Sequence, residues 1–218
     1  MAQLGDDIFY DYKPGRKDFS PIILLHGTGG DEKDLRSIGE NLFPDSPLIG
    51  IRGRVQENGQ NRYFKRTVDG HFDQQDLIVG EKWLLNALIQ IMRHLELPLA
   101  TPIVVGYSNG ANIAADLLLR GGPVFHAAVL FHPMPVSDPL PERPEEPLKG
   151  VPIFATYGRD DSIVSEDEFK ALTKALNTQG ATVVEHTSDN GHSLSLAEIE
   201  GAQNWLSHFQ QPTEEKKA

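Results

Sequence analysis

Residues 106–110 of this 218-residue chain read Gly-Tyr-Ser-Asn-Gly, and this stretch decides the fold. It follows an apolar run at 103–106, which predicts a buried strand, and it precedes an amphipathic stretch, which predicts a helix. A sharp strand-to-helix turn strains the backbone of its central serine and leaves room only for small residues at the flanking positions, where Gly106 and Gly110 stand. Ser108 is therefore expected at the carboxyl edge of a sheet, beside a helix N-terminus that favours negative charge.

Short apolar runs and amphipathic stretches alternate along the rest of the chain. The apolar runs predict strands at 22–26, 48–51, 103–106, 127–131, 151–157 and 183–186. The amphipathic stretches predict helices at 73–94, 109–120, 165–178 and 196–209. This alternation predicts a mostly parallel sheet with helices on both faces. With the serine motif, it indicates a single domain of the α/β-hydrolase fold over residues 1–218, ending in a flexible tail at about 212–218.

Two segments break this alternation. Residues 53–72 are polar and glycine-containing, and residues 133–152 are rich in proline, which excludes a helix or central strand there. Long loops in a compact domain often act as lids or binding loops, and we expect that role for both. Charged residues in and beside the first segment predict a solvated ion-pair cluster, with a substrate clamp as the alternative; they are Arg52, Arg54, Glu57 and Arg62.

Composition excludes several classes of function. The formal net charge of −11 argues against nucleic acid and against an anionic membrane surface, because both require clustered basic residues. The chain has no cysteine, which excludes disulfides, thiolate metal sites and a cysteine nucleophile. Residues 1–12 lack the features of a signal peptide, so we expect a cytoplasmic protein. A homodimer is compatible with the sequence, although no exposed apolar stripe requires one.

A serine nucleophile needs a base, and in this fold the acid and then the histidine follow the serine along the chain. Asp160 and Asp161 both follow a predicted strand, and we favour Asp161 because the next three residues resemble those after the acid in many hydrolases. His192 follows Gly191 in a loop between the last predicted strand and the last helix. That position lets its imidazole reach Ser108, so we predict a Ser108–His192–Asp161 triad.

Residues 25–30, Leu-His-Gly-Thr-Gly-Gly, follow the first predicted apolar strand. Glycines there let backbone N–H groups face an oxyanion, and we predict that the N–H groups of Thr28 and Asn109 form the oxyanion hole. The spacing matches no phosphate-binding loop, so nucleotide binding is not expected. His26 precedes the nucleophile and is expected to be a structural hydrogen-bonding residue behind the hole.

The residues predicted to contact substrate are His26, Gly27, Phe64, His132 and Met134. His132 and Met134 are at most part of the pocket wall, because they follow a predicted strand near the same edge of the sheet. We predict no metal, since no further ligands stand at a suitable spacing from His132.

Five stretches together resemble a known family: 25–32, 52–59, 106–114, 131–133 and 191–192. They are similar to the carboxylesterase/phospholipase family, and within it to bacterial carboxylesterases related to hydroquinone- and quinone-responsive hydrolases. The resemblance implies an α/β-hydrolase without cofactor, active on short acyl esters. It implies the same triad and the same oxyanion hole. The dienelactone hydrolases are similar in fold but use cysteine.

The sequence thus predicts a carboxylic ester hydrolase that forms an acyl-enzyme on Ser108 and acts on a small-molecule ester. Two alternatives stay open. A lysophospholipase or acyl thioesterase would use the same residues and would need a longer apolar groove. A non-catalytic binding protein with this fold would usually lose a triad residue or the oxyanion glycines, whereas the chain has all of them.

Overall fold

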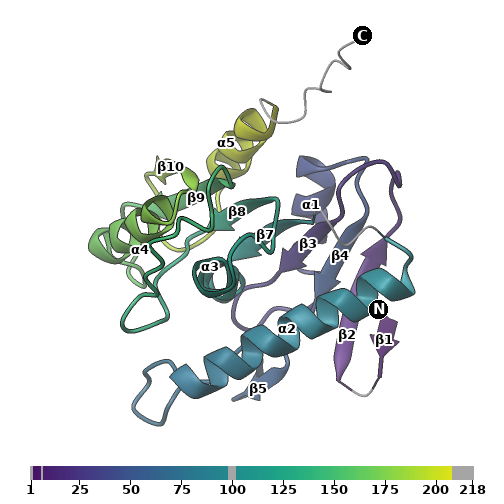
Figure 1. Ribbon diagram of the computed structural model, residues 1–218, viewed down its shortest axis with the longest axis horizontal. Helices are drawn as coiled ribbons and strands as arrows, with labels where there is room; N and C mark the ends of the chain where they lie inside the picture. The colour runs from purple at the N-terminus through teal and green to yellow at the C-terminus, as the bar shows by residue number, and fades with distance from the viewer. Residues whose placement is uncertain (1, 6, 98–101, 208–218) are drawn as a thin grey trace.

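A central sheet of eight strands organises the computed structural model, which describes residues 2–5, 7–97 and 102–207 (Figure 1). Six strands of this sheet run parallel: β3, β4, β7, β8, β9 and β10. The other two, β1 and β2, join its edge in antiparallel pairs. In spatial order they are β1 (Ala2–Leu4), β2 (Ile8–Lys13), β4 (Leu48–Ile51), β3 (Ile22–Leu25), β7 (Ile103–Tyr107), β8 (Ala127–Phe131), β9 (Pro152–Gly158) and β10 (Thr182–Ser188). This is the α/β-hydrolase fold, and the prediction of a mostly parallel sheet is confirmed.

All six predicted strands are present, and the structure adds four that the sequence analysis did not predict. Two of these are the edge strands β1 and β2. The other two, β5 (Val55–Glu57) and β6 (Gln60–Arg62), form a hairpin inside the polar segment. Their connection is Asn58-Gly59, with both residues at positive φ, which is the preferred sequence of a two-residue hairpin turn. The predicted tail at 212–218 lies outside the described residues.

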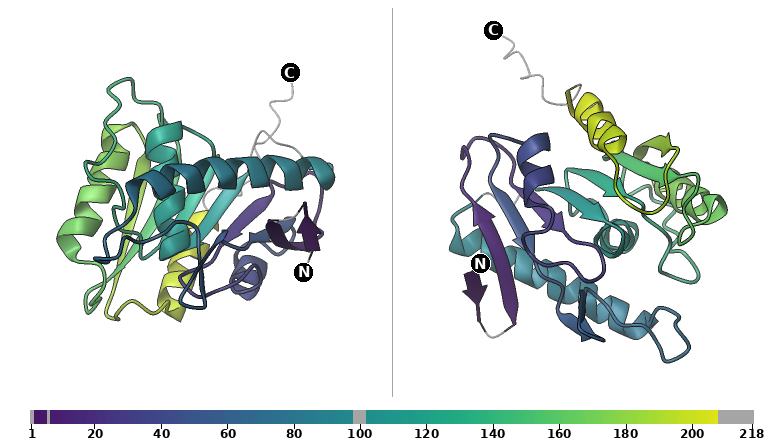
Figure 2. Two further views of the ribbon diagram at one scale, coloured as in Figure 1. Left: turned by 90° about the horizontal axis from the view of Figure 1, so that it is seen from below. Right: turned by 180° about the vertical axis from the view of Figure 1, so that it is seen from behind.

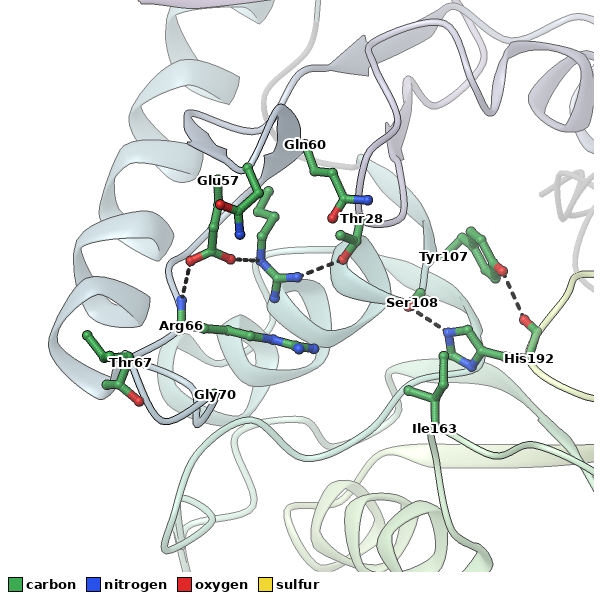
Figure 3. A pocket seen from close by; sticks show the side chains of 13 residues that line it. Thr28, Glu57, Gln60, Arg66, Thr67, Gly70, Tyr107, Ser108, Ile163 and His192 are labelled. Atoms are coloured by element: carbon green, nitrogen blue, oxygen red, sulfur yellow. Dashed lines mark hydrogen bonds and ion pairs between the residues drawn. The ribbon is translucent and has the colours of Figure 1, made fainter.

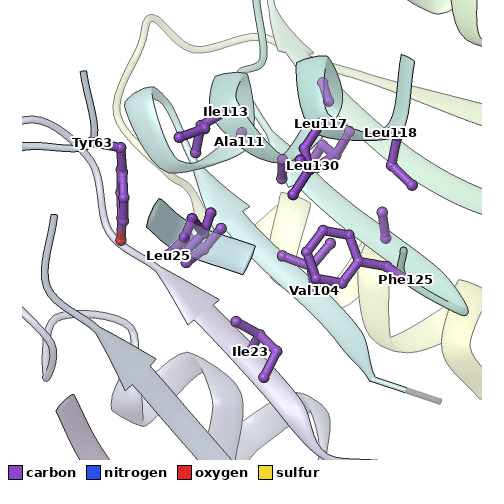
Figure 4. Packing of buried hydrophobic residues seen from close by; sticks show 14 of the residues in the cluster. Ile23, Leu25, Tyr63, Val104, Ala111, Ile113, Leu117, Leu118, Phe125 and Leu130 are labelled. Carbon is purple, nitrogen blue, oxygen red and sulfur yellow. The ribbon is translucent and has the colours of Figure 1, made fainter. Parts of the chain in front are cut away.

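Helices cover both faces of the sheet (Figure 2). One face packs against α2 (Gln74–His94), α3 (Asn109–Gly121) and α4 (Glu166–Thr178), and the other against α1 (Arg36–Leu42) and α5 (Leu196–Ser207). The strands are apolar on both sides for this reason. Ile23 and Leu25 of β3 lie in the core on the side of α2, α3 and α4 (Figure 4), while Ile22 and Leu24 lie in the core on the side of α1 and α5.

The predicted helices are confirmed except where 196–209 extends beyond the described residues. The structure adds α1, whose seven residues are too few to show a clear helical period. Ser165 caps α4 through a reciprocal capping box with Glu168, as its sequence predicts. Among the described residues, no helix is both long and apolar enough to cross a membrane.

The two interrupting segments are anchored differently. Residues 133–151 contain no helix or strand, as their prolines predict. The polar segment buries Tyr63 and Phe64 completely, so its middle belongs to the core, whereas residues 65–71 are exposed. The predicted solvated ion-pair cluster there is wrong for two members: Arg62 is 3% exposed, and Arg52 pairs with Glu32, a carboxylate that is itself buried.

A buried polar cluster joins α2, α3 and the proline-rich segment. Arg120 donates from Nε to Asp116 Oδ2 at 2.8 Å, Ser137 also binds Asp116, and Glu81 lies beside them on α2. Burial, with the nearby Asp116 carboxylate, raises the pKa of Glu81 to about 9. Glu81 is therefore protonated in the folded protein at neutral pH, whereas it ionises in the unfolded chain.

Replacement of Glu81 by glutamine should increase thermal stability at neutral and alkaline pH. A raised pKa stabilises the fold fully below the unfolded value near 4.5, and this contribution is lost as pH rises toward 9. The Tm difference between Glu81→Gln and wild type should therefore grow by at least about 2 °C between pH 5 and pH 8, measured by circular dichroism melts. The matched control is Glu200→Gln on the exposed side of α5, which should show no such trend. A pH-independent difference for Glu81→Gln would contradict the assignment.

Candidate active site

The turn between β7 and α3 holds Ser108 in a strained conformation. Its backbone has φ 49° and ψ −115°, which is unfavourable for a residue with a Cβ atom. The Ser108 N–H donates to the Phe131 carbonyl at 2.9 Å, which ties the turn to β8. A Cβ atom on Gly106 would lie 2.7 Å from the Ala111 backbone, and one on Gly110 would lie 2.1 Å from the Leu25 carbonyl oxygen. Both flanking glycines are therefore required by space, as the motif predicts.

Ser108, His192 and Asp161 form a continuous hydrogen-bonded chain. His192 Nε2 lies 2.8 Å from Ser108 Oγ, and His192 Nδ1 lies 2.8 Å from Asp161 Oδ2. Figure 3 shows Ser108 and His192 turned toward one another beside Ile163. Asp160 makes no contact of this kind among the described residues; its N–H donates to the Asn190 carbonyl. The geometry therefore selects Asp161 over Asp160.

The surroundings of Asp161 keep it ionised. Its side chain is fully buried, and burial alone would raise its pKa. The hydrogen bonds from the Val164 N–H at 3.0 Å, from His192 and from the Ile163 N–H at 2.8 Å outweigh burial, so the pKa of Asp161 is lowered. An ionised Asp161 accepts a hydrogen bond from the Nδ1–H of His192. Nε2 of His192 then carries no proton and can accept a hydrogen bond from the Ser108 hydroxyl.

Tyr107 holds the loop that carries His192. Its hydroxyl donates to the His192 carbonyl at 2.9 Å, and its ring lies 5.8 Å from the imidazole, centroid to centroid. Tyr107 is the second residue of the G-x-S-x-G motif, so the same turn presents the nucleophile and fixes the base.

The predicted oxyanion loop lies beside the nucleophile. Thr28 lines the same pocket as Ser108. Asn109 is the first residue of α3, and the first N–H groups of a helix have no partner within it. Buried Arg62 of the β5–β6 hairpin donates from Nη1 to Thr28 Oγ1 at 2.9 Å, and this hydrogen bond connects the hairpin to the predicted oxyanion loop. The structure thus brings both predicted oxyanion donors to the edge of the sheet where Ser108 stands.

His26 lies behind this loop as a structural hydrogen-bonding residue. Its Nε2 accepts from the Gly53 N–H at 2.9 Å, so its Nδ1 carries the proton and donates to the Gly27 carbonyl at 2.6 Å. Burial lowers the pKa of His26, which fits the neutral form. Tyr63 accepts from the His26 N–H, and its own N–H donates to Asn109 Oδ1 at 2.9 Å. These contacts link the oxyanion loop to the start of α3.

A pocket of about 560 Å³ opens above the triad. Ser108, His192 and Ile163 lie at one end of the pocket, while Glu57 and Arg66 of the polar segment 53–72 lie at the other (Figure 3). An adjoining groove of about 890 Å³ shares Arg66, Gly70 and Ile163 with the pocket and continues along the proline-rich segment. Both interrupting segments therefore form walls around the nucleophile.

The residues predicted to contact substrate fall in two places. Met134 lines the adjoining groove. His26, Phe64 and His132 are each no more than 1% exposed, and neither they nor Gly27 line the pocket or the groove. A substrate role for these four stays a prediction without a pocket contact behind it.

The sequence analysis missed Glu198. It lies in the first turn of α5, its side chain is fully buried, and its Oε1 is 2.9 Å from His132 Nε2. Only its position three residues after Ser195, the spacing of a capping box, is visible in the sequence. Within the described residues, His132, Asp161 and His192 are the one group whose ligand atoms converge closely enough for a metal ion. In this structure the Nδ1 atoms of His132 and His192 both lie within hydrogen-bonding distance of Asp161 Oδ2.

Comparison with known proteins agrees with this geometry. The family model of the dienelactone hydrolases matches residues 60–205. That span contains Ser108, Asp161 and His192. The nucleophile position holds serine, whereas the dienelactone hydrolases noted above use cysteine.

Relatives of similar length include enzymes. The chain is 39% identical over 196 residues to a Bacillus subtilis (strain 168) protein described as a hydrolase, MhqD, covering 89% of this chain and 95% of that protein. The structure of a Bacillus cereus carboxylesterase superposes with a TM-score of 0.87 at 33% identity, covering 94% and 95% of the two chains. The structure of YahD with malic acid gives a TM-score of 0.86 at 34% identity, covering 92% and 98%.

An alanine at position 110 should disrupt the site, because its Cβ atom would meet the Leu25 carbonyl at 2.1 Å. The expected result for Gly110→Ala is a lower Tm, by roughly 5 °C or more, together with loss of esterase activity. Gly121→Ala, at the other end of α3, is the matched control, since its Cβ atom meets nothing closer than 3.5 Å. Equal melting temperatures and activities for the two variants would refute the packing argument.

Proposed function

Since the chain belongs to the dienelactone hydrolase family, we propose that it is a serine carboxylesterase that hydrolyses small or short-acyl esters through an acyl-enzyme on Ser108. That it is a hydrolase of the dienelactone hydrolase and carboxylesterase type follows from its relatives. The observation that carries the finer proposal is the chain of two 2.8 Å contacts from Ser108 through His192 to Asp161.

In the acylation step, Ser108 Oγ attacks the carbonyl carbon of the ester while His192 Nε2 takes the serine proton. The carbonyl oxygen becomes an oxyanion and accepts hydrogen bonds from the N–H groups of Thr28 and Asn109. Asp161 stabilises the imidazolium that forms. The bond to the alcohol oxygen then breaks, His192 returns its proton to that oxygen, and the acyl group stays on Ser108.

In the deacylation step, water replaces the alcohol. His192 takes a proton from the water, whose oxygen attacks the acyl carbon, and the oxyanion forms again at the same donors. The bond from that carbon to Ser108 Oγ breaks, and His192 returns the proton to the serine. The products are one carboxylic acid and one alcohol, and the enzyme regains its starting state.

The size of the pocket supports small substrates. A volume of about 560 Å³ suits a ligand of modest size, and part of its wall is polar because Glu57, Arg66 and Thr67 contribute to it. The adjoining groove supports the second candidate, a lysophospholipase or acyl thioesterase. Met134, Val136 and Leu140 line that groove and offer apolar surface to a longer acyl chain.

A non-catalytic binding role would need no strained nucleophile. The positive φ of Ser108 costs about 1–2 kcal/mol, and such strain is retained where chemistry depends on it. An intact hydrogen-bonded triad beneath an open pocket therefore supports catalysis over binding alone.

Replacement of Ser108 by alanine should lower kcat for p-nitrophenyl acetate by roughly four to six orders of magnitude, because the nucleophile is removed while the oxyanion donors stay. Ser207→Ala at the end of α5 is the matched control and should retain wild-type rates. Mass spectrometry of wild type quenched during turnover should find the acyl group on the peptide that contains Ser108. Full activity in Ser108→Ala would refute the assignment of the nucleophile.

The order of rates from p-nitrophenyl acetate to palmitate should favour short chains, because the pocket above Ser108 has a volume of only about 560 Å³ and a partly polar wall. The measurement is kcat/KM for each ester with the wild-type enzyme. If palmitate is hydrolysed fastest, the groove along Met134 binds the acyl chain and the second candidate replaces the first.

A further inference from the structure

His132 stands between two buried carboxylates. It follows β8, and its side chain is fully buried. Its Nδ1 lies 3.1 Å from Asp161 Oδ2, and its Nε2 lies 2.9 Å from Glu198 Oε1. Both carboxylate side chains are also fully buried. Nε2 and Oε1 make no hydrogen bond among the described residues, so this second contact is a close approach of two buried polar atoms that would be an ion pair with a protonated ring.

The chemistry of the two partners requires two protons on this imidazole. An ionised carboxylate only accepts hydrogen bonds, and a neutral imidazole carries only one N–H. With a neutral ring, a nitrogen lone pair would face a carboxylate oxygen in a site without water contact. With both nitrogens protonated, each carboxylate faces a donor, and one positive charge lies between two negative ones.

Ser195 donates two hydrogen bonds to the Glu198 carboxylate, and such donors favour its ionised form. Burial alone would raise its pKa, but the contacts with His132 and Ser195 outweigh burial and lower the pKa of Glu198 to about 2. Glu198 Oε2 accepts from the Ser195 N–H and from Ser195 Oγ, both at 2.8 Å. Asn190 Nδ2 lies 3.3 Å from the same oxygen. Asp161 is ionised as well, as its own hydrogen bonds dictate.

We propose, resting on the esterase function above, that His132 is a permanently protonated positioning residue of the active site. As an imidazolium between Asp161 and Glu198, it holds Asp161 in place and extends the chain of polar contacts inward from Ser108. It also sets the lower end of the pH range in which His192 acts as a base.

The backbone of His132 supports a selected role. Its φ is 51°, in the left-handed region, where a residue with a Cβ atom is strained. Ser108 is strained in the same way at the end of the adjacent strand. The two residues thus leave neighbouring parallel strands with positive φ, one presenting the nucleophile and the other the inner imidazole.

His132 affects His192 through charge. The ring centroids of His132 and His192 are 5.2 Å apart, and Asp161 Oδ2 binds both rings. The titratable groups that face His132 are Asp161, Glu198, His192 and Tyr107. A fixed cation at this distance disfavours a second proton on His192. His192 therefore stays neutral, and competent as a base, to lower pH.

The first experiment measures kcat/KM against pH for wild type and His132→Gln, with p-nitrophenyl acetate. Loss of the fixed cation should move the acidic limb of the profile upward by roughly one pH unit, since a charge at about 5 Å is worth that much even when screened. Glu198→Gln should move the limb in the same direction, because one of the two carboxylates that hold the proton on His132 is gone. The double variant should move it no further than His132→Gln does.

The matched control is Glu168→Gln in α4. Glu168 and Ser165 exchange the same reciprocal hydrogen bonds as Glu198 and Ser195, but within the part of the chain that the structure describes Glu168 makes no hydrogen bond or ion pair with a triad residue. Its acidic limb should match that of the wild type. A shift in Glu168→Gln equal to that in Glu198→Gln would mean that helix capping explains the effect, and the proposal would be overturned.

A second measurement needs no catalysis. In wild type labelled with ¹⁵N-histidine, one imidazole should keep two protonated nitrogens above pH 8, and that signal should be absent from His132→Gln. A spectrum in which every ring becomes a neutral tautomer below pH 8 would overturn the proposal. If the wild type shows the imidazolium but hydrolyses no ester, the esterase assignment fails and the buried His132 ion pair stands.

Discussion

The site depends on the close approach between the first turn of α3 and the end of β3. A side chain at Gly110 would overlap the carbonyl oxygens of Leu25 and His26, so the helix can rest here only on a glycine. This contact sets the start of α3 directly against the strand that leads into the oxyanion loop. Ser108 and Thr28 are therefore positioned by the same backbone contact, as preorganised donors of the proposed oxyanion hole require.

Parallel strands make the rest of the site possible, because their carboxyl ends meet at one edge of the sheet. Five residues of the proposed site each follow a strand of this edge: Thr28 after β3, Ser108 after β7, His132 after β8, Asp161 after β9 and His192 after β10. The spacing of neighbouring strands, about 4.8 Å, is the distance over which one side chain reaches the next. The chain of contacts runs from Ser108 after β7 to His192 after β10, and then back through Asp161 after β9 to His132 after β8, beside Glu198 of α5.

Sequence patterns predicted what local physics encodes. The apolar runs, the helical periods, the flanking glycines of Ser108 and the order of acid and histidine are all visible along the chain. Short α1 and β1 were missed because they have too few residues to show a period, and β2 because the charged Asp11 and Lys13 interrupt its apolar residues. The burial of Arg62 and Glu198 was missed because only tertiary packing takes these charges out of water. The cytoplasmic location and the homodimer stay predictions of the sequence.

Glu198 and Glu168 show what burial adds to an ordinary local motif. Each stands three residues after a serine, each accepts from that serine's N–H, and each begins a helix on the periphery of the sheet. Capping alone leaves Glu168 partly exposed, where water solvates its charge. Glu198 is also capped by a serine, Ser195, but has no exposed surface. Desolvation of a lone carboxylate would cost several kcal/mol. Helix capping does not require that cost, so the cation on His132 is the interaction that offsets it.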